Sequence, residues 1–439
     1  MSDETLTSWG AYPHFPQSGH MCTWRSRLAE NFADVVARHG TTLPFGKGRS
    51  YGDSCLAASD HVLSLRRLDR LISADWQTGT IVAEAGMTLA DVLKVAIPRG
   101  WFLPVTPGTK FVTLGGAVAN DVHGKNHHVR GTFGRHVRTF GLLRSDRGQV
   151  VCSANDDADL YAATIGGLGL TGIIEWVELQ LIPIRSSQLT VTTVRFNTLD
   201  DFFALSDELD GKNEYTVAWI DGFARGASKG RGVFTAANHA DTGDLSVAAG
   251  KNLAVPFHLP VLAAGGALPR LFNSLYFHKH AAHRRVDPTG YEPFFYPLDG
   301  IGHWNRLYGR HGFQQFQCVI PHKTAQPALQ HILETTARSG GGSCLSVLKR
   351  CGDLASPGLM SFPMPGISLA MDFPQTNTLD KVVFPQLDSI VREAGGRLYP
   401  AKDAHMTAED FRRFYPAWSR VEATRDPALC SRFWKRVTA

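Results

Sequence analysis

Two glycine-rich stretches decide the fold: residues 113–134, TLGGAVANDVHGKNHHVRGTFG, and the earlier residues 44–54, PFGKGRSYGDS. Glycine permits positive φ and leaves no Cβ between the backbone and a ligand. Backbone N–H groups in such turns can point at an anion such as a diphosphate. We therefore expect the two stretches to form one surface that grips a phosphorylated ligand.

Neither stretch fits the common nucleotide-binding motifs. The sequence has no G-x-x-x-x-G-K-[ST], and neither stretch reads as G-x-G-x-x-G opening a helix after a strand. One glycine-rich stretch alone is typical of an ordinary turn. Two of them, flanked by Tyr51, His123 and Lys125, favour a ligand site instead.

Composition sets the broad class. The chain has 439 residues, of which 43% are hydrophobic and 19% charged, which is typical of a globular protein with two or three domains. A net charge of +5 is small for this length, so we expect no general nucleic-acid binding. A local basic site for a phosphorylated ligand stays open.

The cysteines and histidines give no motif for a metal ion. The seven cysteines form no C-x-x-C pair and are interpreted as reduced thiols. His127 and His128 are expected as surface or interface residues, pointing in opposite directions along an extended chain, so a metal site there is not expected. The sequence shows no secretory signal and no apolar run of membrane-spanning length, so we expect a cytoplasmic protein without a transmembrane helix.

Hydrophobic spacing predicts an α+β arrangement in the first part of the chain. Helices are predicted where apolar residues recur every three or four positions, and strands where they alternate or run together. Thr88 is a plausible N-cap. The predicted helices are 27–40, 89–99 and 159–164, and the predicted strands are 62–65, 80–83, 138–143, 150–152 and 173–182.

After residue 186 the predicted elements become longer. Strands alternate with the predicted helices 199–209, 325–339 and 379–394, which favours one antiparallel sheet covered by helices. We predict three parts, residues 1–186, 187–396 and 397–439, the last returning to the first. The segment 249–277 is apolar but interrupted by prolines, so it cannot form one long helix. It is either a buried linker or a lid or apolar surface for a lipid.

Five segments together resemble the FAD-linked oxidases of the vanillyl-alcohol-oxidase superfamily. Within it they are most similar to oxidases that act on a polyprenyl-phosphate-linked ribose. The resemblance implies a two-part FAD-binding domain of the PCMH type and a substrate domain with an antiparallel sheet. The segments are GKGRSYGDS (46–54), PVTPGTKFVTLGGAVANDVHGKNHH (104–128), GGLGLTGII (166–174), YPLDGIGHWNR (296–306) and LYPAKDAH (398–405).

The resemblance implies a set of FAD contacts. Many superfamily members attach the flavin to a histidine in the first loop, and residues 44–54 contain none, so we expect noncovalent FAD. His123 could act as a proton relay or position the cofactor, and we favour positioning. The matching residues are Gly48, Arg49, Ser50, Tyr51, Gly108, Gly115, Gly116, Asn120, His123, Ile174 and Tyr399.

The resemblance also implies the catalytic groups. Lys402 matches the active-site lysine of the family, and it could hold the substrate oxygen or lower the pKa of Tyr51. Tyr51 is a second candidate for the proton acceptor, unless it only packs against the cofactor. Gln317 and Lys349 match positions that face the substrate, although strand polarity on a solvated face would also explain them.

Three functions remain open at this point. The first is oxidation of a polyprenyl-phosphate-linked ribose at C2, with a separate NAD(P)H-dependent short-chain reductase completing epimerisation and with peripheral membrane contact. The second is oxidation of a soluble polyol, sugar or aldonolactone, and the third is a non-catalytic flavin- and lipid-binding partner of the reductase. Ser368 and Ala370 replace an asparagine and a cysteine of the family, so no essential thiol is expected at the flavin.

Overall fold

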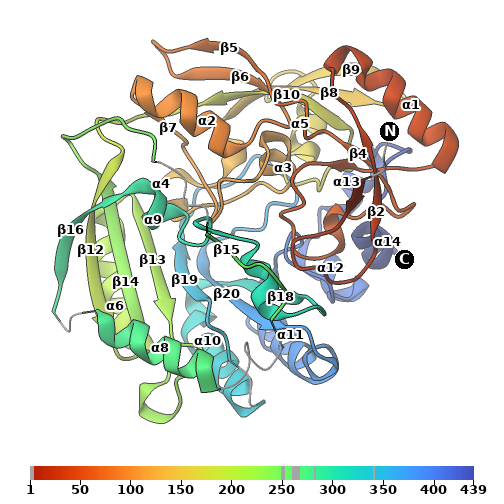
Figure 1. The fold of residues 1–439 in the computed structure, drawn as a ribbon. Helices are drawn as coiled ribbons and strands as arrows, with labels where there is room; N and C mark the ends of the chain where they lie inside the picture. The colour runs from red at the N-terminus through yellow and green to blue at the C-terminus, as the bar shows by residue number, and fades with distance from the viewer. Residues whose placement is uncertain (1–3, 249–252, 260–266, 281–282, 340–341) are drawn as a thin grey trace.

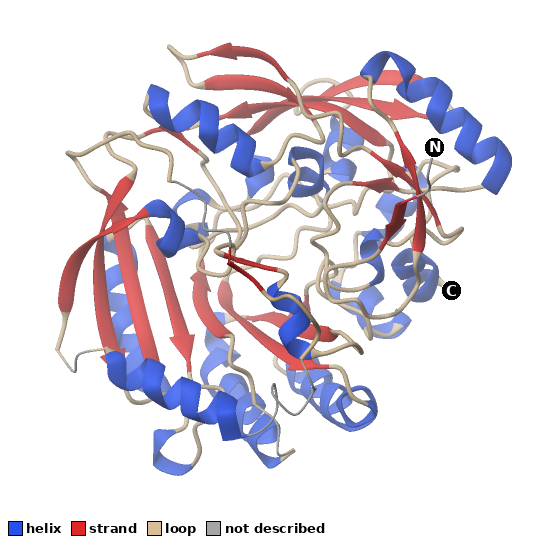
Figure 2. Ribbon diagram, in the orientation of Figure 1, coloured by secondary structure: helices blue, strands red, loops and turns tan. Residues whose placement is uncertain are grey.

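The structure is a computed structural model that describes residues 4–248, 253–259, 267–280, 283–339 and 342–439. Figure 1 shows two sheet-containing regions one above the other, the N-terminal residues in the upper one and a large sheet in the lower one. Figure 2 shows helices on the outer side of the lower region, strands along the top of the upper region, and loops where the two regions meet. Both glycine-rich stretches belong to the upper region.

The upper region contains a four-stranded and a five-stranded sheet, a small sheet of β7 (Trp101–Phe102) and β11 (Ile182–Pro183), and several helices. The four-stranded sheet has the order β1 (Glu4–Leu6), β2 (Gln17–Met21), β4 (His61–Ser64) and β3 (Pro44–Phe45). The five-stranded sheet has the order β5 (Leu71–Asp75), β6 (Thr80–Glu84), β10 (Ile173–Gln180), β8 (Val137–Arg144) and β9 (Gly148–Ser153). The helices are α1 (Leu28–His39), α2 (Leu89–Ala96), α3 (Leu114–Ala119), α4 (His127–Arg130) and α5 (Ala158–Thr164).

Most elements predicted here are confirmed. α1 ends at Gly40, whose φ of +77° suits glycine. The Thr88 side chain accepts a hydrogen bond from the backbone N–H of Asp91, so it caps α2 as predicted. Strand β5 was not predicted, because its residues are mostly exposed and show no apolar alternation.

The lower region is built on one eight-stranded sheet in which every pairing is antiparallel. This confirms the predicted sheet type. Strands β14 and β16 were not predicted; β16 is an exposed edge strand that contains Pro288. The order is β16 (Arg285–Gly290), β12 (Gln188–Phe196), β14 (Gly232–His239), β13 (Tyr215–Ile220), β19 (Ser346–Cys351), β20 (Gly366–Pro374), β18 (Phe313–Ile320) and β21 (Arg397–Leu398).

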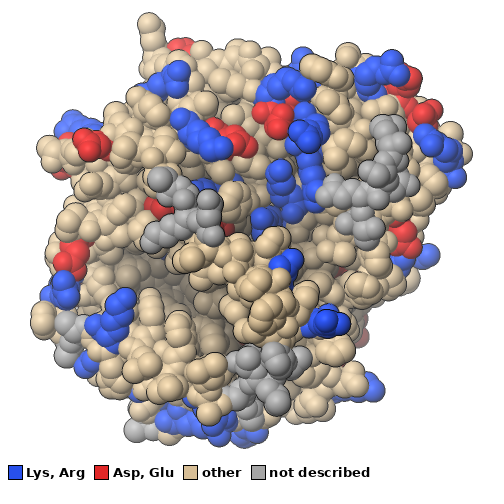
Figure 3. All heavy atoms as spheres, viewed as in Figure 1, with Lys and Arg blue, Asp and Glu red and all other residues tan. Residues whose placement is uncertain are grey.

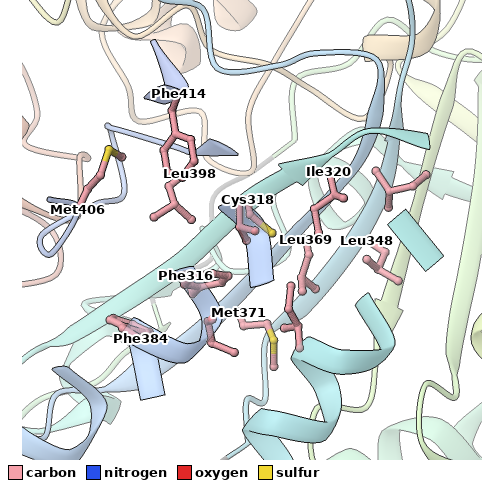
Figure 4. Close-up of a cluster of buried hydrophobic side chains, with 14 of the residues drawn as sticks. Phe316, Cys318, Ile320, Leu348, Leu369, Met371, Phe384, Leu398, Met406 and Phe414 are labelled. Carbon is pink, nitrogen blue, oxygen red and sulfur yellow. The ribbon is translucent and has the colours of Figure 1, made fainter. Parts of the chain in front are cut away.

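The two faces of this sheet have opposite roles, because successive side chains of a strand point to opposite sides. One face packs on α6 (Leu199–Leu209), α10 (His322–Arg338) and α11 (Phe384–Glu393) and forms the apolar core. Figure 4 shows part of this core, in which Phe316, Cys318 and Ile320 of β18 point the same way as Leu369 and Met371 of β20. The other face is turned toward the glycine-rich loops.

The C-terminal residues return to the upper region. The helices there are α12 (Ala408–Phe414), α13 (Trp418–Thr424) and α14 (Arg432–Thr438). Leu429 pairs with Thr42 in an isolated bridge, and the Arg436 guanidinium forms ion pairs with Asp53 and Asp403. These contacts join the end of the chain to the first glycine-rich loop. The predicted boundary at 397 falls on β21, which still pairs with β18, and the three-part division stays a prediction.

The proline-containing apolar segment is described only in part, because residues 249–252 and 260–266 lie outside the described residues. The described parts hold β15 (Leu253–Ala254) and α8 (Ala267–Lys279). Helix α8 leaves an apolar stripe in solvent, with exposures of 66%, 56%, 55% and 62% at Leu268, Leu271, Phe272 and Leu275. Among the described residues no helix is long and apolar enough to cross a bilayer.

Candidate active site

A cavity of about 790 Å³ lies where the glycine-rich loops face the eight-stranded sheet. Figure 3 shows that this side of the molecule is hollowed, and that the atoms around the hollow are mostly uncharged. Every site residue predicted from the sequence lines this one cavity, although the role of each stays a prediction. They are Gly48, Arg49, Ser50, Tyr51, Gly108, Gly115, Gly116, Asn120, His123, Ile174, Gln317, Lys349, Tyr399 and Lys402.

The two glycine-rich stretches touch each other. A Cβ on Gly46 would lie 2.5 Å from the Oγ1 of Thr113, so only glycine fits where the first loop passes the start of α3. The Oγ1 of Thr113 accepts a hydrogen bond from the N–H of Gly116, and the N–H of Gly115 donates to the carbonyl of Ala85. Our expectation that these two N–H groups point at an anion is therefore wrong. These glycines instead allow the loops to approach closely.

The first loop also packs against the segment that carries Lys402. A Cβ on Gly52 would lie 1.7 Å from the carbonyl oxygen of Asp403, which excludes any side chain at this position. The N–H of Tyr51 donates to the carbonyl of Ala401. This backbone contact places the Lys402 ammonium 3.4 Å from the centre of the Tyr51 ring. The geometry is a cation–π contact with the ring face rather than a contact with the hydroxyl.

Burial raises the pKa of the Tyr51 hydroxyl well above its usual value, and the negative charge of Asp372 raises it further. The sequence-based idea that Lys402 favours a Tyr51 phenolate is therefore not supported. The hydroxyl of Tyr51 stays protonated at neutral pH, so it can donate a hydrogen bond but not accept a proton.

Lys402 has an acidic partner that the sequence analysis did not identify. Burial lowers the pKa of Lys402 to about 7, while the charge of Asp372 acts to raise it. Burial raises the pKa of Asp372 to about 7, and a hydrogen bond of 2.5 Å from the Gln315 amide opposes this rise. Two buried groups of opposite charge whose pKa values meet near neutrality can hold one proton between them.

Alternation along β20 is the signal that could have identified Asp372. Ser368, Ala370 and Asp372 line the cavity, whereas Leu369 and Met371 between them belong to the core. Ser368 and Ala370 were expected at the site, and the same alternation leads two residues further to Asp372. The register pairs Asp372 with Gln315 of β18, which explains their hydrogen bond.

A second group of polar side chains lies around His123. The Lys349 ammonium donates to the Nδ1 of His123 and, at 2.6 Å, to the carbonyl of Gly124. The Nε2 of His123 lies 3.2 Å from the side-chain nitrogen of Gln317. Burial first, and then the Lys349 charge, hold the pKa of His123 well below its usual value. The ring is therefore neutral, with Nδ1 as acceptor, which favours positioning over proton relay.

Two further residues near this group differ from expectation. Lys125 lines the cavity and was not assigned a role, yet burial lowers its pKa to about 7. His127 is buried rather than at the surface, and its Nδ1 accepts a hydrogen bond from the N–H of Gly352. The expectation of an extended chain was wrong here, because residues 127–130 form the short helix α4.

The cavity suits FAD. Glycines border it where the backbone must come close, and one of them, Gly108, has no atom within 4 Å of the place where a Cβ would lie. Two residues that line this cavity each carry a buried side-chain atom without a hydrogen-bond partner within the described chain, the Nε of Arg49 and the Oγ of Ser54. Buried polar atoms are nearly always paired, so a polar ligand in the cavity would suit these two residues.

Comparison with known proteins agrees with this geometry. Residues 27–153, which contain both glycine-rich stretches, match the family model of an FAD binding domain. Over 401 residues the chain is 35% identical to the decaprenylphosphoryl-β-D-ribose oxidase of Mycolicibacterium smegmatis, covering 87% of this chain and 85% of that protein. This chain belongs to the decaprenylphosphoryl-β-D-ribose oxidase family. It is an FAD-dependent oxidoreductase, and the expected PCMH-type fold is confirmed.

Other relatives divide into long and short matches. A protein of Streptomyces coelicolor described as uncharacterized is 35% identical over 362 residues, covering 78% of this chain and 96% of that protein. The L-gulonolactone oxidase of Mus musculus is 27% identical over only 139 residues, or 31% of each chain. This chain therefore shares most of its length with the first two relatives and about a third with the last.

Proposed function

We propose that this protein oxidises the C2 hydroxyl of a polyprenyl-phosphate-linked ribose to a 2-keto sugar, the first half of an epimerisation to the arabinose form. The observation that supports it most is the buried Lys402–Asp372 pair in the FAD cavity. The long match to an oxidase of such a ribose supports the choice of substrate. Bound FAD would supply the acceptor for the hydride that leaves the alcohol carbon.

Lys402 and Asp372 account for the proton that leaves the substrate hydroxyl during oxidation. When an alcohol carbon gives up a hydride, the hydroxyl proton must leave as well, and a nearby base takes it. Burial lowers the pKa of Lys402, so its uncharged form can accept that proton at its Nζ, and the Asp372 carboxylate stabilises the ammonium that forms. Tyr51 keeps its own proton and orients the Lys402 side chain through its ring.

The polar side chains around His123 account for binding of the substrate. Lys349 is a buried cation whose described contacts are the neutral His123 ring and a backbone carbonyl. Burying the Lys349 ammonium costs free energy, and hydrogen bonds to an anionic or strongly polar ligand would offset that cost. We assign Lys349 and Gln317 to the sugar or phosphate of the substrate, and His123 to fixing the Lys349 ammonium.

Helix α8 provides an apolar surface for the polyprenyl tail of the proposed substrate. Its inner side is anchored to the sheet: Tyr276 packs edge-on against Trp219 at 4.7 Å, and the Asn273 amide donates to Asp221 at 2.9 Å. Its outer side is the apolar stripe of Leu268, Leu271, Phe272 and Leu275, and Phe272 also lines the cavity. An apolar surface that starts at the cavity suits a polyprenyl tail that leaves the site, and it also suits peripheral contact with a membrane.

Anaerobic bleaching of the flavin tests the substrate. We expect a polyprenyl-phosphate-linked ribose to reduce the flavin much faster than a ribose phosphate without the lipid. The double variant Leu271→Ser/Leu275→Ser should weaken binding of the lipid-linked substrate only, whereas Val382→Ser, a similarly exposed apolar residue outside α8, should not. Equal reduction by soluble polyols or aldonolactones would favour the soluble-substrate oxidase. No bleaching by any glycosyl lipid would favour the non-catalytic flavoprotein.

Two further parts of the proposal have their own tests. The 2-keto product must be reduced to complete epimerisation, and we propose a separate NAD(P)H-dependent short-chain reductase; NAD(P)H consumption should then require both proteins and the substrate. We also propose that FAD is held noncovalently, because residues 44–54 contain no histidine. Acid precipitation should leave the yellow colour in the supernatant, and colour in the pellet would contradict this.

A further inference from the structure

Three histidines from separate elements meet on the upper region. His20 lies on β2, His39 is the last residue of α1, and His61 is the first residue of β4. One ring nitrogen from each lies within 4.8 Å of the other two, and all three residues are partly exposed. Figure 1 shows β2, α1 and β4 on the opposite side of the molecule from α8, so the cluster belongs to another surface than the lipid stripe.

One pair of nitrogens already has the spacing of metal ligands. The Nε2 of His20 and the Nδ1 of His61 are 3.0 Å apart and share a hydrogen bond, and the His39 ring stacks on the His61 ring at 3.5 Å between centroids. Two ligands of a tetrahedral zinc ion stand about 3.3 Å apart, because each Zn–N bond is about 2.0 Å long. A bound ion would replace the proton of this hydrogen bond, and the stacked ring of His39 would have to rotate to direct a nitrogen at the ion.

The local fold holds the three residues in place. β2 and β4 are neighbouring parallel strands, and Ser18 of β2 pairs with His61 of β4. His20 therefore lies two residues beyond the position on β2 that pairs with His61. The hydroxyl of Thr42 donates to the carbonyl of His61 and fixes its backbone. His39 stands at the C-terminal end of α1, where the helix dipole is negative and stabilises a cation.

We infer that His20, His39 and His61 form a binding site for a divalent transition-metal ion of the zinc class. Three imidazoles with solvent access leave a fourth position for water, and imidazole selects zinc, nickel or copper over magnesium and calcium. The ion would tie α1 to β2 and β4 and so stabilise the FAD-binding region. This departs from our expectation of no metal site, which considered only histidines and cysteines close together in sequence. The inference does not depend on the proposed substrate.

Calorimetric titration with Zn²⁺ tests the site. Tag-free, FAD-loaded protein is stripped with a chelator, dialysed and titrated with Zn²⁺ alone, with Mg²⁺ as the comparison ion. We expect one Zn²⁺ per chain and no heat from Mg²⁺. At a hundredfold excess over its Kd, Zn²⁺ should raise the Tm by about 3 °C. Co²⁺ bound in its place should show the visible absorption of a tetrahedral ion.

Matched variants locate the ion. His39→Asn and His20→Gln should each abolish the Zn²⁺ heat and the Tm rise, and unchanged flavin absorbance will report that the fold is intact. His331→Asn, at an exposed position of α10, should bind Zn²⁺ like the unmodified protein. The inference is overturned if the unmodified protein takes up no Zn²⁺, or if both cluster variants bind it with unchanged affinity.

Discussion

Lys402 and Lys349 line the same cavity, Lys349 buried and Lys402 partly buried, yet different groups face their ammonium groups. Lys402 is paired electrostatically with the carboxyl group of Asp372, and burial brings the pKa values of both to about 7. Lys349 contacts the neutral ring of His123 and a carbonyl, and burial lowers its pKa to about 8. Burial alone thus weakens the charge of either lysine, but only Lys402 has an acid with which to share a proton.

The difference separates two tasks within one site. When Lys402 takes the proton of a substrate hydroxyl, the Asp372 carboxylate compensates the charge of the ammonium that forms. At Lys349 a compensating charge or dipole has to come from the ligand. We therefore expect replacement of Lys402 to change the rate of oxidation and replacement of Lys349 to change the affinity for substrate. Variants at these two positions and at Tyr51 test this difference.

Replacing Lys402 should have the largest effect. In Lys402→Ala the rate of anaerobic flavin reduction at saturating substrate should fall about 10³-fold, the typical contribution of a general base. FAD should be retained, because no other predicted FAD contact changes. The measurement is stopped-flow flavin absorbance, with Lys381→Ala, an exposed lysine outside the cavity, as the control. Near-native reduction in Lys402→Ala would remove Lys402 from the mechanism.

Replacing Lys349 should change binding instead. We expect Lys349→Ala to raise the apparent Kd of the substrate about 30-fold, because a hydrogen bond to a charged group is lost. The limiting rate of flavin reduction should change by only a few-fold. The two values come from the same stopped-flow experiment with varied substrate concentration. A fall in the limiting rate with unchanged Kd would mean that the two lysines share one task.

Replacing Tyr51 should have the smallest effect. Tyr51→Phe keeps the ring under the Lys402 ammonium and removes only a hydroxyl that stays protonated. The rate of flavin reduction should fall less than about tenfold, as expected when one neutral hydrogen bond is lost. A fall as large as that in Lys402→Ala would restore Tyr51 as the proton acceptor.

Local patterns predicted much of this molecule. Helix 199–209 and the Thr88 cap were found from apolar spacing and capping chemistry alone, and both depend on neighbours in the sequence. The antiparallel sheet type was predicted from strands that alternate with helices and again from the family resemblance, whereas the set of residues around the cavity came from the resemblance. The edge strand β16 was not predicted, because an exposed strand needs no apolar residues and its pairing with β12 is a tertiary contact.

The chemistry of the site was harder to predict, since it depends on long-range contacts. Asp372 acquires its raised pKa because β20 turns it into the cavity, where burial disfavours the carboxylate, while the Lys402 charge acts to lower that pKa. Tyr51 was expected to be acidified by a nearby cation, but the cation meets its ring face and burial dominates. The meeting of His20, His39 and His61 likewise depends on how β2, α1 and β4 pack, which no spacing in the sequence reveals.

The central claim is that Lys402, tuned by Asp372, accepts the substrate proton. The most direct test is the pH dependence of the limiting rate of flavin reduction in the unmodified protein and in Asp372→Asn. The unmodified protein should gain rate as pH rises through about 7, where Lys402 loses its proton. Because the Asp372 charge raises the pKa of Lys402, Asp372→Asn should shift this inflection to lower pH and reduce the plateau. A profile that is flat in the unmodified protein, or an inflection that does not move in Asp372→Asn, would contradict the account.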